Sequence, residues 1–124
     1  MPVISAEDMR TYELHGVQFT SLTSPSSGGS TEISVWRTEV PPGTPAATHQ
    51  LTCQEVLVIL AGRAVAHIDG VATEATAGDV VLVPPDTDFA LENVGAEALR
   101  VMACYPVGGQ AVLDGEKVTL PWMM

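Results

Sequence analysis

Hydrophobic residues along this chain fall into short runs that are bounded by glycine, proline, asparagine and aspartate. Inside the runs, apolar residues either alternate with polar ones or form a brief β-branched stretch, which indicates strands rather than helices. The predicted strands are residues 12–22, 33–40, 56–60, 63–68, 71–75, 80–83, 89–92, 99–105, 111–113 and 117–120. Many short strands with regular turn signals are typical of an all-β sandwich or barrel.

Local signals add detail to this pattern. Residues 5–10 begin with a capping serine, continue with acids and end in a basic residue, which predicts one short helical turn. Asp69-Gly70 is the strongest two-residue hairpin signal, and Asp114-Gly115 marks a second hairpin. In the strand 33–40, the alternation of side chains places Trp36 on the side that faces the core.

The length of the chain predicts a single domain over residues 1–124. Its expected parts are an N-terminal arm and loop at 1–32, a barrel core at 33–106, and a C-terminal hairpin and tail at 107–124. Trp122 in the tail leaves two interpretations open. Either it contacts a second subunit, or it packs over one end of the barrel.

Composition and charge then limit the classes of function. The hydrophobic content of 46% supports a real core, and no apolar stretch is long enough to cross a bilayer. Fifteen acidic against five basic residues give a formal net charge of −10, which repels nucleic-acid backbones and anionic membrane surfaces. We therefore expect a soluble cytoplasmic protein whose partner is neither nucleic acid nor membrane. Cys53 and Cys104 are predicted to be free thiols.

The candidate chemistry lies in residues 42–62, which hold the only His and Glu at a suggestive spacing. Prolines and a glycine exclude a regular element before His49, and a β-branched strand follows Glu55. We therefore expect His49 and Glu55 on neighbouring strands, with side chains that meet across the sheet. The other two histidines, His15 and His67, are predicted to lie at the surface or at strand edges.

This stretch resembles the first motif of the cupin family. That motif runs Gly, five residues, His-x-His, three or four residues, Glu, six residues, Gly. The chain has Gly43, five residues, His49-Gln50-Leu51, three residues, Glu55, six residues and Gly62. The spacing agrees at every step, and leucine stands where the second histidine is expected.

A second stretch resembles the second cupin motif, which runs Gly, five residues, Pro-x-Gly, two residues, His, three residues, Asn. Here it is Gly78, five residues, Pro84-Pro85-Asp86, two residues, Phe89, three residues and Asn93. The two motifs lie as close together as in small single-domain cupins, and the likeness extends over residues 35–106.

The resemblance implies a fold and a broad role. Cupins form a jelly-roll β-barrel, also called a double-stranded β-helix, which is often a homodimer and binds its ligand in the bore. Small cupins similar to this chain act as cyclases or isomerases in natural-product and sugar pathways. The family also contains dioxygenases and storage proteins, so the fold alone does not define the reaction.

The departures from the motifs bear on metal binding. In metal-binding cupins the two histidines and the glutamate of the first motif and the histidine of the second hold one divalent ion. Here Leu51 and Phe89 occupy two of those positions. Because catalytic zinc-type sites normally use three protein ligands, His49 and Glu55 are too few, and we expect no metal or other cofactor. The alternative is a divalent transition metal on His49 and Glu55 with unconventional ligands. The substitute ligands available are Cys53, Gln54 and Cys104.

Without a metal, His49 and Glu55 are candidate catalytic residues. A carboxylate beside an imidazole favours the charged ring, so we expect Glu55 to orient His49 and to raise the pKa of its ring toward neutrality. Such a group moves protons in ring closures, isomerisations and eliminations. The residues predicted to bind the substrate are Trp36, Leu51, Gln54, Leu57 and Phe89.

The sequence therefore predicts a small-molecule-binding cupin that catalyses metal-independent, non-redox proton transfer on a neutral or hydrophobic organic substrate. Two alternatives stay open. One is a metal-dependent enzyme such as an oxygenase that uses His49 and Glu55. The other is a carrier or sensor in which His49 and Glu55 form a satisfied polar pair without turnover.

Overall fold

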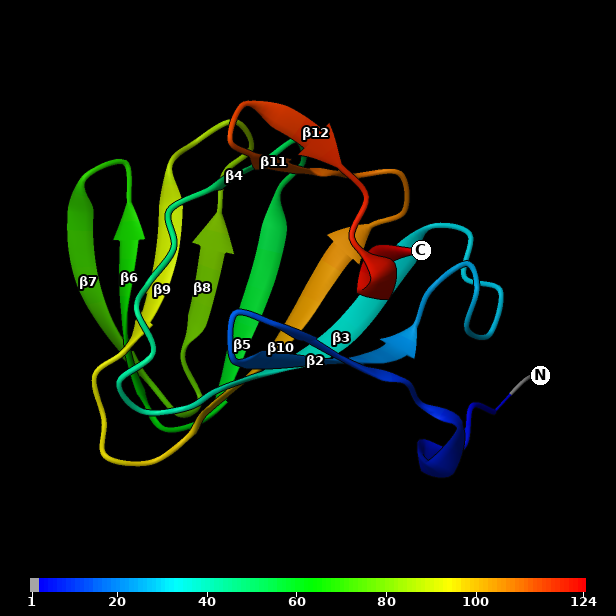
Figure 1. The fold of residues 1–124 in the computed structure, drawn as a ribbon, viewed down its shortest axis with the longest axis horizontal. Coiled ribbons are helices and arrows are strands. Elements are labelled where there is room, and N and C mark those ends of the chain that lie inside the picture. The colour runs from blue at the N-terminus through cyan, green and yellow to red at the C-terminus, as the bar shows by residue number, and fades with distance from the viewer. Residues whose placement is uncertain (1–2) are drawn as a thin grey trace.

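The computed structural model describes residues 3–124, so the first two residues of the predicted N-terminal arm lie outside it. The described chain consists of strands with two short 3₁₀ turns (Figure 1). The elements are η1 (Ala6–Asp8), β1 (Thr11–Leu14), β2 (Val17–Thr23), β3 (Ile33–Val40), β4 (Gln50–Leu51), β5 (Glu55–Ala61), β6 (Arg63–Ile68), β7 (Val71–Thr76), β8 (Val80–Val83), β9 (Phe89–Asn93), β10 (Leu99–Pro106), β11 (Ala111–Leu113), β12 (Glu116–Val118) and η2 (Pro121–Met123).

These strands form three antiparallel sheets. The largest has the order β1-β2-β3-β10-β5-β8, and the smaller ones have the orders β12-β11-β4 and β7-β6-β9. In Figure 1 the β7-β6-β9 sheet lies to one side and the β11–β12 hairpin crosses the top. The result is the all-β jelly roll that the sequence predicts, assembled from three hydrogen-bonded sheets.

The core lies on the inner face of the six-stranded sheet. Alternation along β3 buries Trp36, as predicted, together with Ser34 and Val40, while Arg37 on the opposite face is exposed. The central strand β10 lies between β3 and β5 in the sheet. Its inner side chains Leu99, Val101, Ala103 and Tyr105 are almost completely buried. This apolar face forms one side of the candidate site.

Both predicted Asp-Gly hairpins form. Asp69-Gly70 joins β6 to β7, and Asp114-Gly115 joins β11 to β12. All four residues have positive φ values between 49° and 79°. Aspartate and glycine tolerate this left-handed backbone, which gives two-residue hairpins the twist of their strands.

The prediction of one outer strand over residues 12–22 is wrong. The segment is a hairpin of β1 and β2, which pair antiparallel around His15-Gly16. His15 has φ 52° and Gly16 has φ 82°. The turn escaped prediction because histidine replaces the Asn or Asp that usually marks this position.

The C-terminal segment folds back onto its own chain. Trp122 is 3% exposed, and its ring stacks on Phe19 with centroids 3.7 Å apart and planes inclined by 1°. Of the two interpretations of Trp122, packing within the subunit is therefore correct, since little of the indole remains for a subunit contact. Among residues 3–124 we find no helix with the length and apolar character needed to span a membrane.

Candidate functional site

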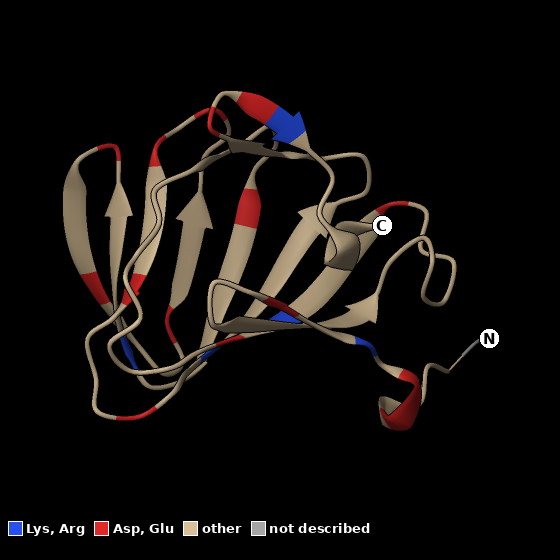
Figure 2. Ribbon diagram, in the orientation of Figure 1, with Lys and Arg blue, Asp and Glu red and all other residues tan. Residues whose placement is uncertain are grey.

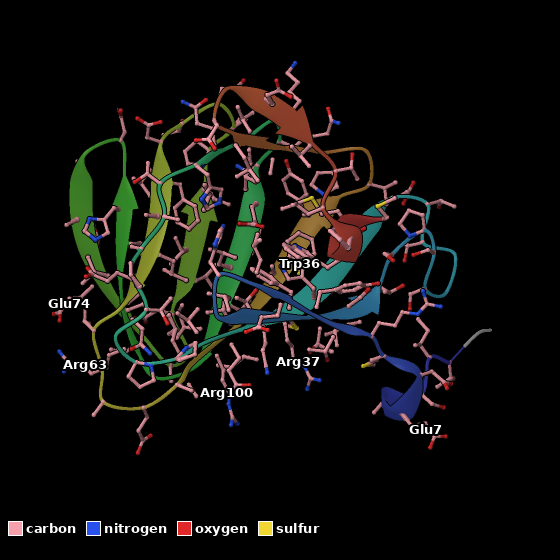
Figure 3. All side chains as sticks on the ribbon, in the orientation of Figure 1. Glu7, Trp36, Arg37, Arg63, Glu74 and Arg100 are labelled. Atoms are coloured by element: carbon pink, nitrogen blue, oxygen red, sulfur yellow. The ribbon has the colours of Figure 1, made fainter. Side chains whose placement is uncertain are left out.

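A cavity of about 440 Å³ lies over the inner face of the six-stranded sheet. Six of the seven predicted site residues line it. They are Trp36, His49, Leu51, Glu55, Leu57 and Phe89. Figure 3 shows Trp36 directed into the interior, whereas the labelled Arg37, Arg63 and Arg100 point away from it.

Gln54 is the exception among the predicted substrate-binding residues. It is exposed and does not contribute to the cavity wall. Glu55 begins β5 with its side chain buried on the inner face. The preceding residue therefore lies outside that face, and the prediction for Gln54 is corrected.

Glu55 occupies the deep wall of the cavity. Its side chain is 5% exposed and makes no hydrogen bond or ion pair with any other residue of the described chain. On β5 it pairs with Val83, and Leu57 is the next side chain on the same face. Burial removes most of the water that would stabilise the carboxylate, and this desolvation raises the pKa of Glu55 from 4.5 to about 8. The carboxyl group is therefore mostly protonated at neutral pH and offers an O–H donor to the cavity.

The position of Glu55 depends on the corner between β4 and β5. The Tyr105 hydroxyl accepts a hydrogen bond from the Cys53 amide at 3.1 Å and donates one to the Gln110 carbonyl at 2.9 Å. Burial raises the pKa of this hydroxyl, so it stays protonated and can donate. These bonds anchor the backbone two residues before Glu55.

His49 also lines the cavity, from the residue directly before β4, where it forms an isolated β-bridge with Phe89. Two backbone hydrogen bonds of 2.9 Å join it to Phe89. Its ring lies edge-on to the Phe89 ring, with centroids 5.4 Å apart. The ring Nδ1 lies 3.0 Å from the Ala47 carbonyl, which can only accept, so Nδ1 carries the hydrogen. In the neutral ring, Nε2 is then left as the proton acceptor.

The predicted contact between His49 and Glu55 does not form. The strand β4 after His49 pairs with β11, whereas β5 belongs to the six-stranded sheet. Within residues 3–124 the ion pairs are Arg63–Glu74, His67–Glu92 and Arg100–Glu39. The corner at residues 52–54 carries the chain from one sheet to another, so the two side chains face the cavity from different walls. The Ala47 carbonyl, and not Glu55, orients the imidazole.

The donor set does not fit the metal that the family implies. Leu51 and Phe89 are buried apolar side chains at two of the four ligand positions. Across the described residues, no group of three or more His, Cys, Asp and Glu side chains is arranged to hold a metal ion. The proposed substitutes do not help, because Cys53, Gln54 and Cys104 are all absent from the cavity wall. No chemical step is therefore assigned to a metal.

Several residues of the site were not anticipated. His15 and Asp114 reach the cavity from the β1–β2 and β11–β12 turns. Trp122 and Met123 reach it from η2. The turn signals at these positions were visible in the sequence, but nothing local indicated that the three segments converge. Among the described residues no Lys or Arg lines the cavity. Figure 2 shows the basic segments at the margins of the fold.

The fold and the site together define a class of protein, a jelly roll whose inner sheet carries a partly open, mostly apolar cavity with a few polar groups. The family profile described as "Cupin domain" matches residues 36–105. The chain belongs to the cupin family.

Known proteins support this assignment at different levels. An uncharacterized protein of Methanocaldococcus jannaschii, MJ1618, is 35% identical over 69 residues, which span 54% of this chain and 55% of that protein. The match thus covers only about half of either sequence.

Solved structures share the fold at low sequence identity. The polyketide cyclase RemF from Streptomyces resistomycificus matches with a TM-score of 0.72 and 15% identity, covering 96% of this chain and 82% of that one. A predicted oxalate decarboxylase from Thermotoga maritima matches with a TM-score of 0.68 and 22% identity, covering 83% and 96%. An RmlC-like cupin from Shewanella frigidimarina matches with a TM-score of 0.68 and 20% identity, covering 82% and 86%.

Proposed function

We propose that this cupin is an enzyme that catalyses metal-independent, non-redox proton transfer on a neutral or hydrophobic organic molecule. Cyclisation, isomerisation and elimination are the reactions of this class. The observation that carries the proposal is the environment of Glu55, a carboxyl group held neutral in an apolar cavity that it shares with an oriented histidine. Perturbed acids in enclosed cavities are candidates for catalysis.

The two groups supply the two halves of a proton transfer. His49 Nε2 takes a proton from a carbon next to a carbonyl; the electron pair of the broken C–H bond forms a carbon–carbon double bond, and the π pair of the carbonyl moves to its oxygen. Glu55 donates its proton to that oxygen, which gives a neutral enol. Where the substrate carries a further conjugated double bond, return of the proton from His49 to the far carbon of the dienol, with Glu55 recovering its own proton from the hydroxyl, completes an isomerisation. Positioned acid–base groups contribute roughly 10² to 10⁴ in rate.

The charge of the site supports an uncharged substrate. No Lys or Arg of the described residues reaches the cavity, and the chain carries a net charge of −10. An anionic substrate would find no permanently charged partner there. One protein with the same fold is a polyketide cyclase, and cyclisation is one of the reactions proposed here, although 15% identity supports only the fold.

The alternative is a carrier that binds the same kind of molecule without turnover, and the apolar character of the cavity wall is equally suited to it. A metal-dependent oxygenase is less well supported, because the donor set does not provide a third ligand.

Exchange of hydrogen for deuterium at the α-carbons of 2-tetralone in D2O tests the proposal. This uncharged ketone is small enough for the cavity, and its exchange requires the proposed base and acid. We expect the protein to accelerate exchange above the buffer rate and His49→Ala to abolish the acceleration, while His67→Ala, a matched change of a surface histidine, leaves it intact. Binding of the ketone without accelerated exchange would favour the carrier.

We also propose that the protein is a cytoplasmic homodimer of single-domain subunits. Support comes from the outer face of the six-stranded sheet, where Leu60, Val80 and Leu82 remain 46%, 59% and 54% exposed. Val80 and Leu82 lie on β8, the edge strand of the sheet. Clustered exposed apolar side chains are typical of subunit contacts.

Sedimentation analysis tests the homodimer. Leu82→Asp is expected to convert the dimer to a monomer, because it places a charge in the proposed contact. Gln18→Asp introduces the same side chain at an exposed position of β2 and should leave the mass unchanged. A parent protein that sediments as a monomer refutes the dimer.

A further inference from the structure

Two segments outside the residues matched to the cupin domain contribute to the wall of the cavity. The match spans residues 36–105. The β1–β2 hairpin contributes Leu14 and Phe19, and the C-terminal segment contributes Leu113, Trp122 and Met123. The residues matched to the cupin domain thus supply His49 and Glu55, whereas part of the wall comes from segments on either side of them.

These two segments meet in an aromatic contact. Trp122 stacks on Phe19 at 3.7 Å with almost parallel rings, and Tyr12 packs against the indole from a centroid distance of 6.3 Å. The backbone adds a hydrogen bond of 2.7 Å from the Ser26 amide to the Met124 carbonyl. Trp122 is 3% exposed, so its indole is held between the hairpin and the cavity.

We propose that Trp122 is the specificity-determining residue of this site, and that its indole limits the length of the uncharged ligand that the cavity accepts. This inference rests on the proposed function in one respect, the nature of the ligand. Since aromatic stacking and tight packing hold the indole in one position, a longer ligand must displace it and lose those contacts. A shorter ligand fits without that loss.

The Trp122 indole is also, together with that of Trp36, the largest side chain of the wall. Replacing a buried tryptophan by alanine leaves a cavity that the surroundings fill only in part, and apolar cavities of this kind bind apolar molecules. Trp36 and Trp122 are the two tryptophans of the chain, and both line the cavity. In a Trp122 variant, Trp36 therefore remains as a fluorescent reporter of the same site.

The experiment compares two uncharged, flat probes of different length, bicyclic 2-naphthol and tetracyclic tetracene-5,12-dione. Their dissociation constants are measured by equilibrium dialysis, with quenching of tryptophan fluorescence as a second readout. We expect the parent to prefer 2-naphthol, and Trp122→Ala to shift the ratio of the two dissociation constants by about tenfold or more toward the longer probe. Such a shift corresponds to about 1.4 kcal/mol.

Two further variants distinguish the loss of the Trp122 indole from a general disturbance of the fold. Trp122→Phe preserves an aromatic ring against Phe19 and should retain most of the parent's preference, whereas Trp122→Leu, which keeps an apolar side chain, should shift the ratio in the same direction as alanine. An unchanged ratio in folded Trp122→Ala or Trp122→Leu, or the absence of binding of both probes to parent and variants alike, overturns the inference. Because binding alone is measured, the outcome does not depend on turnover by His49 and Glu55.

Discussion

The two titratable residues proposed for catalysis, Glu55 and His49, differ in burial and in hydrogen bonding. Glu55 begins a strand of the large sheet, is buried among apolar side chains and makes no polar contact within the described chain. His49 lies in an isolated β-bridge before β4 and is partly exposed; its backbone is hydrogen-bonded to Phe89 and its ring to the Ala47 carbonyl. Desolvation shifts the pKa of Glu55, whereas hydrogen bonds fix the orientation of the His49 ring.

This difference explains how Glu55 and His49, only six residues apart in the sequence, are suited to the proposed roles of acid and base. Desolvation favours the neutral form of a carboxylic acid and raises the pKa of Glu55 to about 8. A carbonyl that accepts from Nδ1 leaves the other ring nitrogen of His49 ready to accept a proton. Neither effect requires the two side chains to touch. The four predictions that follow test whether Glu55 and His49 contribute independently of each other.

The largest effect is expected from His49→Ala. Removing the proposed base should lower the rate of α-proton exchange in 2-tetralone by roughly 10²-fold or more, because the acceptor of the proton is lost. The dissociation constant of the ketone should change by only a few-fold, since the apolar walls remain. Nuclear magnetic resonance measures the exchange, and equilibrium dialysis measures the binding. Equal losses of rate and of binding would assign His49 to substrate binding.

Glu55→Gln addresses the other wall through the dependence of rate on pH. The proposed acid is active when protonated, so activity of the parent should fall as the pH rises through about 8, the pKa of Glu55. Glutamine does not ionise, so the variant should be slower, because it cannot transfer the proton, and should lack this alkaline decline. If parent and variant have identical pH–rate profiles, Glu55 is not the acid.

The same residue is expected to make folding stability depend on pH. The pKa of Glu55 is about 8 in the folded protein and 4.5 at its usual value, so the folded state holds the proton more tightly. Its contribution is present in full below about pH 4.5 and is lost as the pH rises through about 8, at up to about 1.4 kcal/mol per pH unit between these values.

Urea unfolding at several pH values between 5 and 8 measures this slope. Glu55→Gln should lose the part of the slope that belongs to Glu55, while Glu32→Gln, which removes the same charge at an exposed position, should retain it. Equal slopes in the parent and Glu55→Gln would mean that the carboxyl group ionises normally in the folded protein.

The smallest effect is expected from Tyr105→Phe. The substitution leaves the Cys53 amide without its acceptor, whereas the Gln110 carbonyl keeps the hydrogen bond from the Thr52 amide; the unpaired amide costs about 1–3 kcal/mol of unfolding free energy. Chemical unfolding at one pH measures it. The hydroxyl anchors the corner before Glu55 and has no hydrogen bond to the segment around His49. Any loss in the rate of α-proton exchange of 2-tetralone should therefore result from a displaced Glu55. A protein with unchanged stability would show that water replaces the hydroxyl.

Much of this arrangement was accessible from the sequence. The alternation of apolar residues predicts most strands and the inner position of Trp36, and both Asp-Gly pairs predict hairpins that form. The spacing of Gly43, His49, Glu55 and Gly62 indicates the family and brings six of seven predicted residues to one cavity. These signals are local, because strand period and turn geometry depend on neighbouring residues.

Tertiary structure alone decided the rest. The corner at residues 52–54 sends His49 and Glu55 to different sheets, so the predicted ion pair is replaced by a solitary buried carboxyl group. The convergence of His15, Asp114 and Trp122 on the cavity likewise depends on contacts between distant parts of the chain. A buried acid's pKa depends on which side chains and how much water surround it in space, and a linear pattern does not specify those neighbours.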